Sequence, residues 1–307
     1  MARFWSLRGL SWPELAKRTC RDSWNDRIFG ESARLAFYFF FAMFPALLLP
    51  FILLGTSPGG SELRSALIGT FKQVLPPDAW VRVAETIRNL SASNAFGAAA
   101  SIAAVGAAWG ALNGTWAIMT GLNKAYEVKE ERPWWRLLYI TFGLTISFTV
   151  LGLIALIAIL WGSRAGTAMV QHLGVPAHLG FLWRIIQWAV IVVVLFLSFA
   201  LLYRFGPNLK DRRWQWSNPG SVIAVAFWTA FTLLLRVYLE HSSSSERMYG
   251  GLGAAAIILA WLYLTGAAIF IGGEANSEIE KAAAEAGHGD VREAGEERSG
   301  GAGSPGA

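Results

Sequence analysis

The sequence has few residues that could build a disulfide framework or a metal centre. Of its 307 residues, one is a cysteine, Cys20, and four are histidines. One cysteine excludes an internal disulfide, and no two histidines have the His-x-x-x-His spacing that holds zinc on a helix. We therefore expect no metal site and no cofactor.

Charged residues are also scarce. They make up 15% of the chain, against 54% hydrophobic residues, whereas soluble proteins carry about 25% charged residues. The clearest consequence is the run 248–273, which has no charge between Arg247 and Glu274. A helix of this length can cross a hydrocarbon core of about 30 Å. The composition predicts that most of the chain lies in lipid.

Several such runs predict an all-α fold class, a polytopic membrane protein with six transmembrane helices in a domain of residues 35–281. The expected spans are about 35–55, 95–121, 137–163, 184–203, 219–239 and 250–273. Residues 56–94 predict two short amphipathic helices in an outer loop, joined at Pro76 and Pro77. Residues 165–183 also lack charge, but their glycines and proline predict an outer loop or a membrane-dipping segment.

The two ends of the chain predict different roles. Residues 1–34 are basic and contain three tryptophans, which is typical of a cytoplasmic interfacial segment. A short helix after Ser11 would present Cys20, Trp24 and Ile28 on one face. Residues 282–307 predict a disordered acidic cytoplasmic tail.

The distribution of basic residues predicts the topology. Six spans put both termini on one side of the membrane. If that side is the cytoplasm, 18 of the 26 Lys and Arg residues lie inside and 8 outside, as the positive-inside rule favours. Because these residues flank apolar spans, anionic lipid headgroups explain them better than nucleic acid, which we do not expect as a partner.

Small residues predict how the helices pack. Gly106, Gly110 and Gly114 recur every four residues on the second span, which is typical of close helix packing. We expect their partner to be the sixth span, with its Gly250 and Gly253, and we count Tyr249 at the start of that span among the packing residues. We also expect leucine at Gly110 to disrupt the fold and alanine to be much better tolerated.

Polar residues inside the spans predict further contacts. Asn113 lies beside the glycines, near the middle of the second span, and predicts a partner inside the bundle because an unpaired amide in lipid is costly. Charged and amide side chains also gather at the predicted cytoplasmic ends of several spans. They form a candidate binding network for an anionic lipid: Arg34, Asn123, Lys124, Arg204, Asn208, Glu274 and Asn276.

Two interpretations of this network remain open. Its members are ordinary helix-end and topology residues, or they act together. In the second case Glu274 pairs with Arg34 or Arg204, the asparagines complete the hydrogen bonds, and a remaining cation receives a phosphate-bearing headgroup.

The same residues favour a non-enzymatic function. No catalytic set of nucleophile, base and acid can be assembled, and no paired intramembrane carboxylates are apparent. Transport or handling of lipid or another envelope component uses the features present. The alternative is a scaffold with envelope protein partners, and a membrane-associated nuclease or hydrolase fits least well. The sequence leaves the oligomeric state open.

Short motifs along the membrane domain resemble the YihY/virulence factor BrkB family. The motifs are Ala36-Phe37-Tyr38 with Phe44-Pro45; Leu122-Asn123-Lys124-Ala125-Tyr126 with Arg132-Pro133-Trp134-Trp135; Leu202-Tyr203-Arg204-Phe205-Gly206-Pro207-Asn208 with Pro219-Gly220; and Tyr249-Gly250 through Gly273-Glu274-Ala275-Asn276. Arg34 departs from the small apolar residue often found in the family. The resemblance implies a six-helix protein of the bacterial inner membrane with a suspected role in envelope or lipid transport. The ribonuclease name once given to the family finds no support in these residues.

Overall fold

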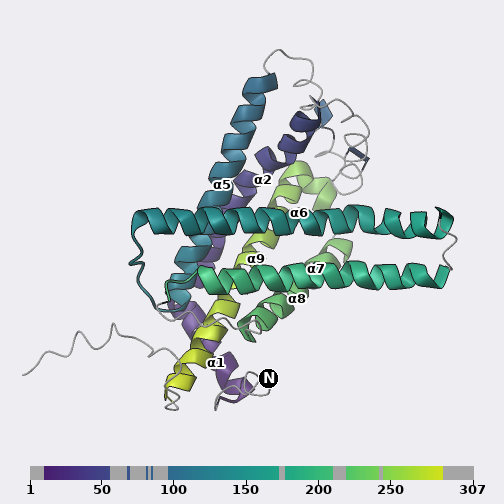
Figure 1. Cartoon of the computed structure of the whole chain (residues 1–307). Coiled ribbons are helices and arrows are strands. Elements are labelled where there is room, and N and C mark those ends of the chain that lie inside the picture. The colour runs from purple at the N-terminus through teal and green to yellow at the C-terminus, as the bar shows by residue number, and fades with distance from the viewer. Residues whose placement is uncertain are drawn as a thin grey trace, which may run out of the picture. The chain divides into compact units, whose positions relative to one another are not determined.

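The computed structural model describes residues 10–55, 68–69, 81, 84–85, 96–172, 177–209, 219–241 and 245–285. In this part of the chain the fold is all-α, as predicted (Figure 1). Its helices are α1 (Trp12–Asn25), α2 (Ile28–Gly55), α5 (Phe96–Ala125), α6 (Trp134–His172), α7 (Ala177–Phe205), α8 (Pro219–His241) and α9 (Ser245–Glu285). Most of the predicted amphipathic loop and the tail beyond Glu285 lie outside the described residues.

Five stretches of helix are long and apolar enough to cross a membrane. They are Ser101–Ala125, Trp134–Ile159, Ile185–Phe205, Pro219–Tyr238 and Ala255–Ala282. These stretches correspond to the second to sixth predicted spans. The predicted first span lies within α2, which is not among the five in the described part of the chain. The structure thus supports a multi-pass protein without confirming the count of six.

The outer loop predicted at 165–183 is wrong for most of its length. α6 continues to His172, and α7 already begins at Ala177. The sequence between these helices holds Gly174 and Pro176, and a proline is tolerated next to the start of a helix but not in its interior. Gly174 and Pro176 therefore fall between the two helices in the sequence, whereas Gly166 and Gly180 lie within α6 and α7.

The helices fold into two compact units. Unit 1 comprises Met1–Ser32, Trp116–Ala230 and Leu264–Ala307, and unit 2 comprises Ala33–Thr115 and Phe231–Tyr263. Helices α2, α5, α8 and α9 each contribute to both units.

In unit 2, the predicted glycine face of α5 packs closely, but its partner is α2. A Cβ at Gly110 would lie 2.5 Å from the Cβ of Ala42, and one at Gly114 would lie 2.8 Å from the ring of Phe39. The expected partner, the start of the sixth span, is therefore wrong. Tyr249 and Gly250 lie in α9, but the surroundings of their side chains are outside what the structure describes.

Asn113 finds its partner within its own helix. Its Nδ2 donates to the carbonyl oxygen of Trp109 at 2.7 Å. This bond satisfies one of the two N–H groups of the amide. The expected contact with another helix of the bundle stays a prediction.

Unit 1 is built on the pairing of α6 with α7, which lie side by side (Figure 1). Its hydrophobic core joins these helices to the end of α5. The buried members are Met119, Leu137 and Leu144, with Ile140, Phe148, Leu201 and Phe205 packed against them. Other apolar side chains of α6, such as Ile146 and Leu153, point outward, as expected for a helix that faces hydrocarbon.

The short N-terminal helix α1 forms where predicted. Ser11 caps it by accepting a hydrogen bond from the Glu14 N–H, and Pro13 lies in its first turn. Its buried face consists of Leu15, Thr19 and Ser23. Cys20 and Trp24, the face predicted to rest on lipid, are exposed. Ile28 is buried at the start of α2, so it is not part of this face.

Candidate functional site

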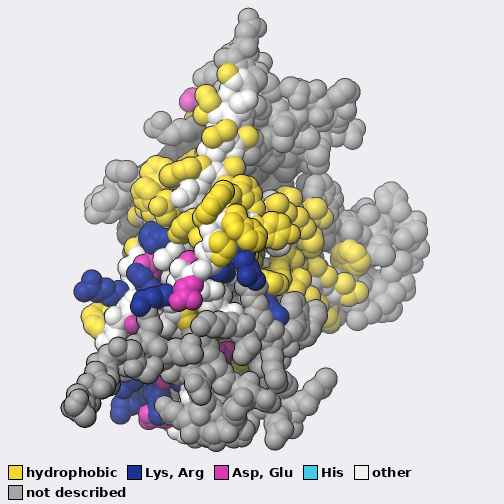
Figure 2. Space-filling model, turned by 60° about the vertical axis from the view of Figure 1, so that its left-hand side comes forward, with side chains coloured by type: hydrophobic (Ala, Val, Ile, Leu, Met, Phe, Trp, Pro, Cys, Tyr) yellow, Lys and Arg dark blue, Asp and Glu magenta, His cyan; other side chains and the backbone are white. Residues whose placement is uncertain are grey.

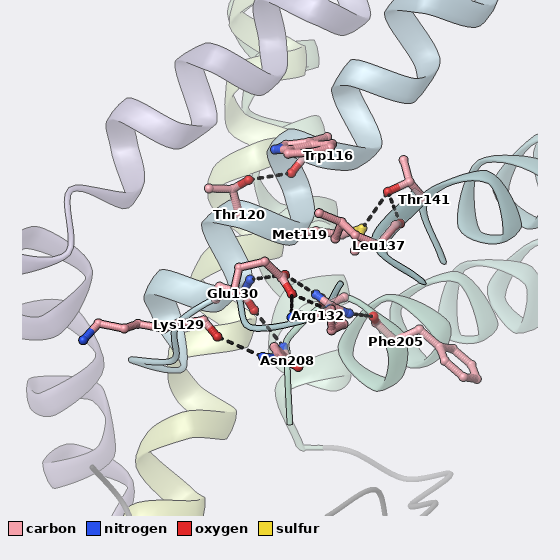
Figure 3. A network of polar contacts seen from close by, with 12 residues as sticks. Trp116, Met119, Thr120, Lys129, Glu130, Arg132, Leu137, Thr141, Phe205 and Asn208 are labelled. Carbon is pink, nitrogen blue, oxygen red and sulfur yellow. Dashed lines mark hydrogen bonds and ion pairs between the residues drawn. The ribbon is translucent and has the colours of Figure 1, made fainter. Parts of the chain in front are cut away.

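A buried asparagine joins the end of α5 to the end of α7 in unit 1. Asn123 accepts a hydrogen bond at Oδ1 from the backbone N–H of Asn208 at 2.7 Å, and its Nδ2 donates to Glu130 at 2.8 Å. Figure 3 shows Glu130 and Asn208 in this group of contacts. Asn208 also donates through its own side chain to the Lys129 carbonyl oxygen at 2.9 Å. Two of the predicted network residues are therefore in direct contact.

Arg132 locks the same loop onto α7. Its guanidinium donates to Glu130 at 2.7 Å and to the carbonyl oxygens of Phe205 and Gly206 at 3.2 and 3.0 Å. Burial alone would raise the pKa of Glu130, but hydrogen bonds from Arg132 and Asn123 hold it below its ordinary value. The carboxylate is thus kept ionised as the acceptor on which both donors converge.

Lys124, the neighbour of Asn123, makes a separate contact. Its Nζ donates to the carboxylate of Glu31, which is buried near the start of α2. Half of the Lys124 side chain remains exposed. This cation therefore serves first to neutralise a buried acid, and it is still reachable from outside.

The C-terminal half of α9 packs closely against the start of α8 through backbone atoms. A Cβ at Gly220 would lie 2.1 Å from the Gly272 carbonyl oxygen, and one at Gly272 would lie 2.3 Å from the Tyr203 hydroxyl. Asn276 accepts a hydrogen bond from the Gly220 N–H at 2.7 Å. Asn276 therefore links α8 to α9, and its side-chain oxygen accepts a hydrogen bond within the protein.

Beyond Asn276, α9 meets α1 through charged groups. Glu278 accepts from Lys281 at 2.7 Å and lies 4.0 Å from Arg18. It also lies within hydrogen-bonding reach of Asp22, which is itself paired with Arg21 at 2.9 Å. The two acids are matched by cations on both helices.

Glu274 lies one turn earlier on α9 than Glu278 and has a different neighbour. It is fully buried, and its carboxyl is within hydrogen-bonding reach of Asp26, at the end of α1. Within the described part of the chain, no donor reaches either Glu274 oxygen. The predicted ion pair of Glu274 with Arg34 or Arg204 is therefore wrong.

The predicted network thus divides into separate contacts. Asn123 and Asn208 lie together, Lys124 pairs with Glu31, and Asn276 and Glu274 belong to the packing of α9. Arg204 is half-buried near the end of α7. Arg34 is part of α2 in unit 2, so it is not counted as a residue of this site.

Sequence reasoning missed several members of the site. They are Asp22, Asp26, Glu31, Glu130, Arg132, Glu278 and Lys281. One signal was available: Asp22 and Asp26, like Glu274 and Glu278, are four residues apart and so share a helix face. Arg132 gave no such signal, because it lies in a loop with several charges.

The exposed surface next to the loop is basic and aromatic. Trp134 and Trp135, at the start of α6, are 77% and 61% exposed, and Lys129 and Arg136 are exposed beside them. Figure 2 shows charged side chains gathered next to a broad hydrophobic area on one face. Exposed tryptophans with cations at the end of an apolar helix are typical of the membrane–water interface.

These features define a multi-pass, all-α membrane protein whose helix ends are tied by buried polar contacts. Residues 19–296 match the family described as Virulence factor BrkB, and the chain belongs to this family. The resemblance inferred from the motifs is therefore confirmed.

Individual relatives agree with this assignment. The chain is 30% identical over 252 residues to the ribonuclease-like protein YfkH of Bacillus subtilis, covering 82% of this chain and 90% of the relative. It is 25% identical over 265 residues to a UPF0761 membrane protein of Xanthomonas oryzae, covering 83% of this chain and 58% of that protein. A UPF0761 membrane protein of Pseudoalteromonas translucida is 26% identical over 161 residues, which is 50% of this chain and 49% of the relative. No solved structure matches the chain.

Proposed function

We propose that this protein binds anionic lipid, or another anionic envelope component, at the cytoplasmic face of the bacterial inner membrane, as a step in its transport or handling. The observation that carries the proposal is the exposed group of Lys129, Arg136, Trp134 and Trp135 beside a loop held to α7 by hydrogen bonds of Arg132 and Asn208. Cations at headgroup depth attract anionic lipid, each contributing about 1 kcal/mol.

The geometry of the loop supports this function in a second way. Two of its three acid groups are paired within the protein, since Glu130 accepts from Arg132 and Asn123, and Glu127 accepts from Lys281 at 3.2 Å. The third, Glu131, is exposed. The surface left around the tryptophans therefore attracts anions more than the sequence of the loop, with its several glutamates, indicates. We further propose that the protein is not an enzyme, because the sequence supplies no nucleophile with a base.

Lipid that copurifies from native membranes tests the proposal. The double variant Lys129→Gln, Arg136→Gln should lose anionic lipid relative to zwitterionic lipid, with an affinity lowered by roughly tenfold or more if two charges are removed. Arg204→Gln should lower it as well, and more than it lowers thermal stability. Arg236→Gln, a cation predicted on the outer side, is the matched control and should change nothing.

Reconstitution in liposomes separates transport from scaffolding. A lipid-handling protein should speed the movement of a labelled anionic lipid between leaflets, and the double variant should slow it. Unchanged lipid composition in every variant, together with no lipid movement, would contradict the proposal and favour the scaffold.

A further inference from the structure

Glu274 and Asp26 are two acids within hydrogen-bonding reach of each other. Three oxygen atoms of this pair, both of Glu274 and Oδ2 of Asp26, are buried and have no hydrogen-bond partner among the described residues. Two ionised carboxylates within hydrogen-bonding reach repel each other, and burying either one without a hydrogen-bond donor costs free energy. One proton shared between them would remove the repulsion and supply the missing donor, because one carboxyl group would donate a hydrogen bond and the other would accept it.

A second acid pair on the same two segments, Glu278 with Asp22, is neutralised by cations. Glu278 and Asp22 lie one helical turn away and have Lys281, Arg18 and Arg21 as partners. The Glu274–Asp26 pair has the same spacing along the same two helices, but none of these cations makes a hydrogen bond to it. The two pairs therefore differ in what neutralises them.

The other charged groups around the pair do not replace the proton. Lys281, the nearest cation on α9, is already bonded to Glu278 and Glu127. Glu127, which follows α5, and Asp22, on α1, add negative charge. Hydroxyl groups on the buried face of α1, Thr19 and Ser23, are also without partners within the described chain.

We propose that Glu274 and Asp26 form a proton-binding site where α1 meets α9, and that release of the shared proton loosens α1 from α9. The site does not depend on lipid binding. Its ligand is a proton rather than a metal ion, because two carboxyls meet here and the described residues contain no group of three or more His, Cys, Asp or Glu side chains that could hold a metal.

Exchange with solvent runs through Asp26. Glu274 is fully buried, whereas Asp26 is half-buried at the end of α1. Burial also raises the pKa of Asp26, a hydrogen bond with Glu274 opposes this rise in part, and the charge of Glu127 adds to it. An acid with a raised pKa stabilises the fold below its ordinary pKa and loses that contribution as the pH rises through the raised value. Docking of α1 should accordingly weaken with rising pH.

The single native cysteine allows a direct test in the full-length protein. Cys20 is exposed on α1, and a second spin label can be placed at the exposed Glu131 through Glu131→Cys. The distance distribution between the labels should be narrow at low pH and broaden as the pH rises between about 5 and about 9, the range in which buried carboxyls titrate. Glu274→Gln should keep it narrow throughout, because the amide donates permanently to Asp26.

Infrared spectroscopy reports the proton itself. The wild type should show the band of a protonated carboxyl that is lost in Glu274→Gln and also in Asp26→Asn, which keeps the test available if the first variant fails to fold. Glu278→Gln is the matched control and should retain the band, because Glu278 is ion-paired. A wild type without this band, the same pH response in Glu274→Gln, or broadening driven by sodium or magnesium at fixed pH would each overturn the proposal.

Discussion

Asn123 and Asn208 are 85 residues apart in sequence and are joined by a hydrogen bond of 2.7 Å from the Asn208 N–H to the Asn123 side chain. Each belongs to a different motif of the family resemblance. The contact shows that these motifs meet in one place, where the end of α5, the following loop and the end of α7 are tied together. The two motifs therefore at least fix the positions of these three segments relative to one another.

The first prediction tests that role. Asn123→Leu should lower the free energy of unfolding by about 1–3 kcal/mol, because it leaves the Asn208 N–H without its acceptor and Glu130 without one donor. Thermal unfolding of the detergent-solubilised protein measures the effect. Ser147→Ala on α6 removes the bond from that hydroxyl to its own helix's Gly143 carbonyl and should change stability little. Equal effects of the two variants would show that the link between α5 and α7 contributes nothing.

The second prediction concerns acid stability. Hydrogen bonds from Arg132 and Asn123 outweigh burial and keep the folded pKa of Glu130 below its ordinary value of 4.5. An acid with a lowered pKa contributes stability that is present above its ordinary pKa and is lost as the pH falls through the lowered value. Glu130→Gln should therefore destabilise the protein at neutral pH and flatten the acid limb of a plot of Tm against pH. A parallel plot, shifted only vertically, would contradict this assignment.

The third prediction revises an expectation drawn from the sequence. The sequence predicts that alanine at Gly110 is much better tolerated than leucine, but the alanine Cβ would itself lie 2.5 Å from the Cβ and 2.9 Å from the Cα of Ala42. Because backbone on α2 must then move, Gly110→Ala should cost about 1–3 kcal/mol. Gly143→Ala on α6 meets no atom within 4 Å and should be neutral or stabilise by up to about 1 kcal/mol. Equal thermal stability of both variants would show that the α2 backbone at Ala42 can shift at little cost in free energy.

The sequence was sufficient for features that depend on local composition. Charge-free runs predicted the helices, the Ser11 cap and Pro13 predicted α1, and the spacing of Gly106, Gly110 and Gly114 predicted a close-packed face. Each of these signals is contained within one element, so no knowledge of the partner is needed.

Partner choice could not be predicted in the same way. A glycine face can pack closely against any helix with small side chains at the contact, so the sequence did not distinguish α2 from the sixth span. Glu274 was expected to pair with an arginine because opposite charges attract, but α1 brings Asp26 to it instead. The buried face of α1 consists of Leu15, Thr19 and Ser23, and its two polar members resemble a solvent-exposed face in the sequence.

The last prediction concerns the topology, because the proposed cytoplasmic location of the basic and aromatic rim depends on it. This rim is the exposed group of Lys129, Arg136, Trp134 and Trp135. α9 contains an apolar stretch, Ala255–Ala282, that can cross a membrane. Reporters inserted within 242–244 and after Gly287 should therefore lie on opposite sides, with the second in the cytoplasm, as the 18-to-8 partition of Lys and Arg requires. Paired alkaline phosphatase and fluorescent protein fusions measure this in whole cells. Since Gly287 lies beyond α9, the second fusion leaves Glu274 and its contact with Asp26 intact. If both positions report the same side, α9 does not cross. If they report opposite sides in the reverse sense, the basic and aromatic rim faces the periplasm, and an anionic component on that side would have to be its ligand.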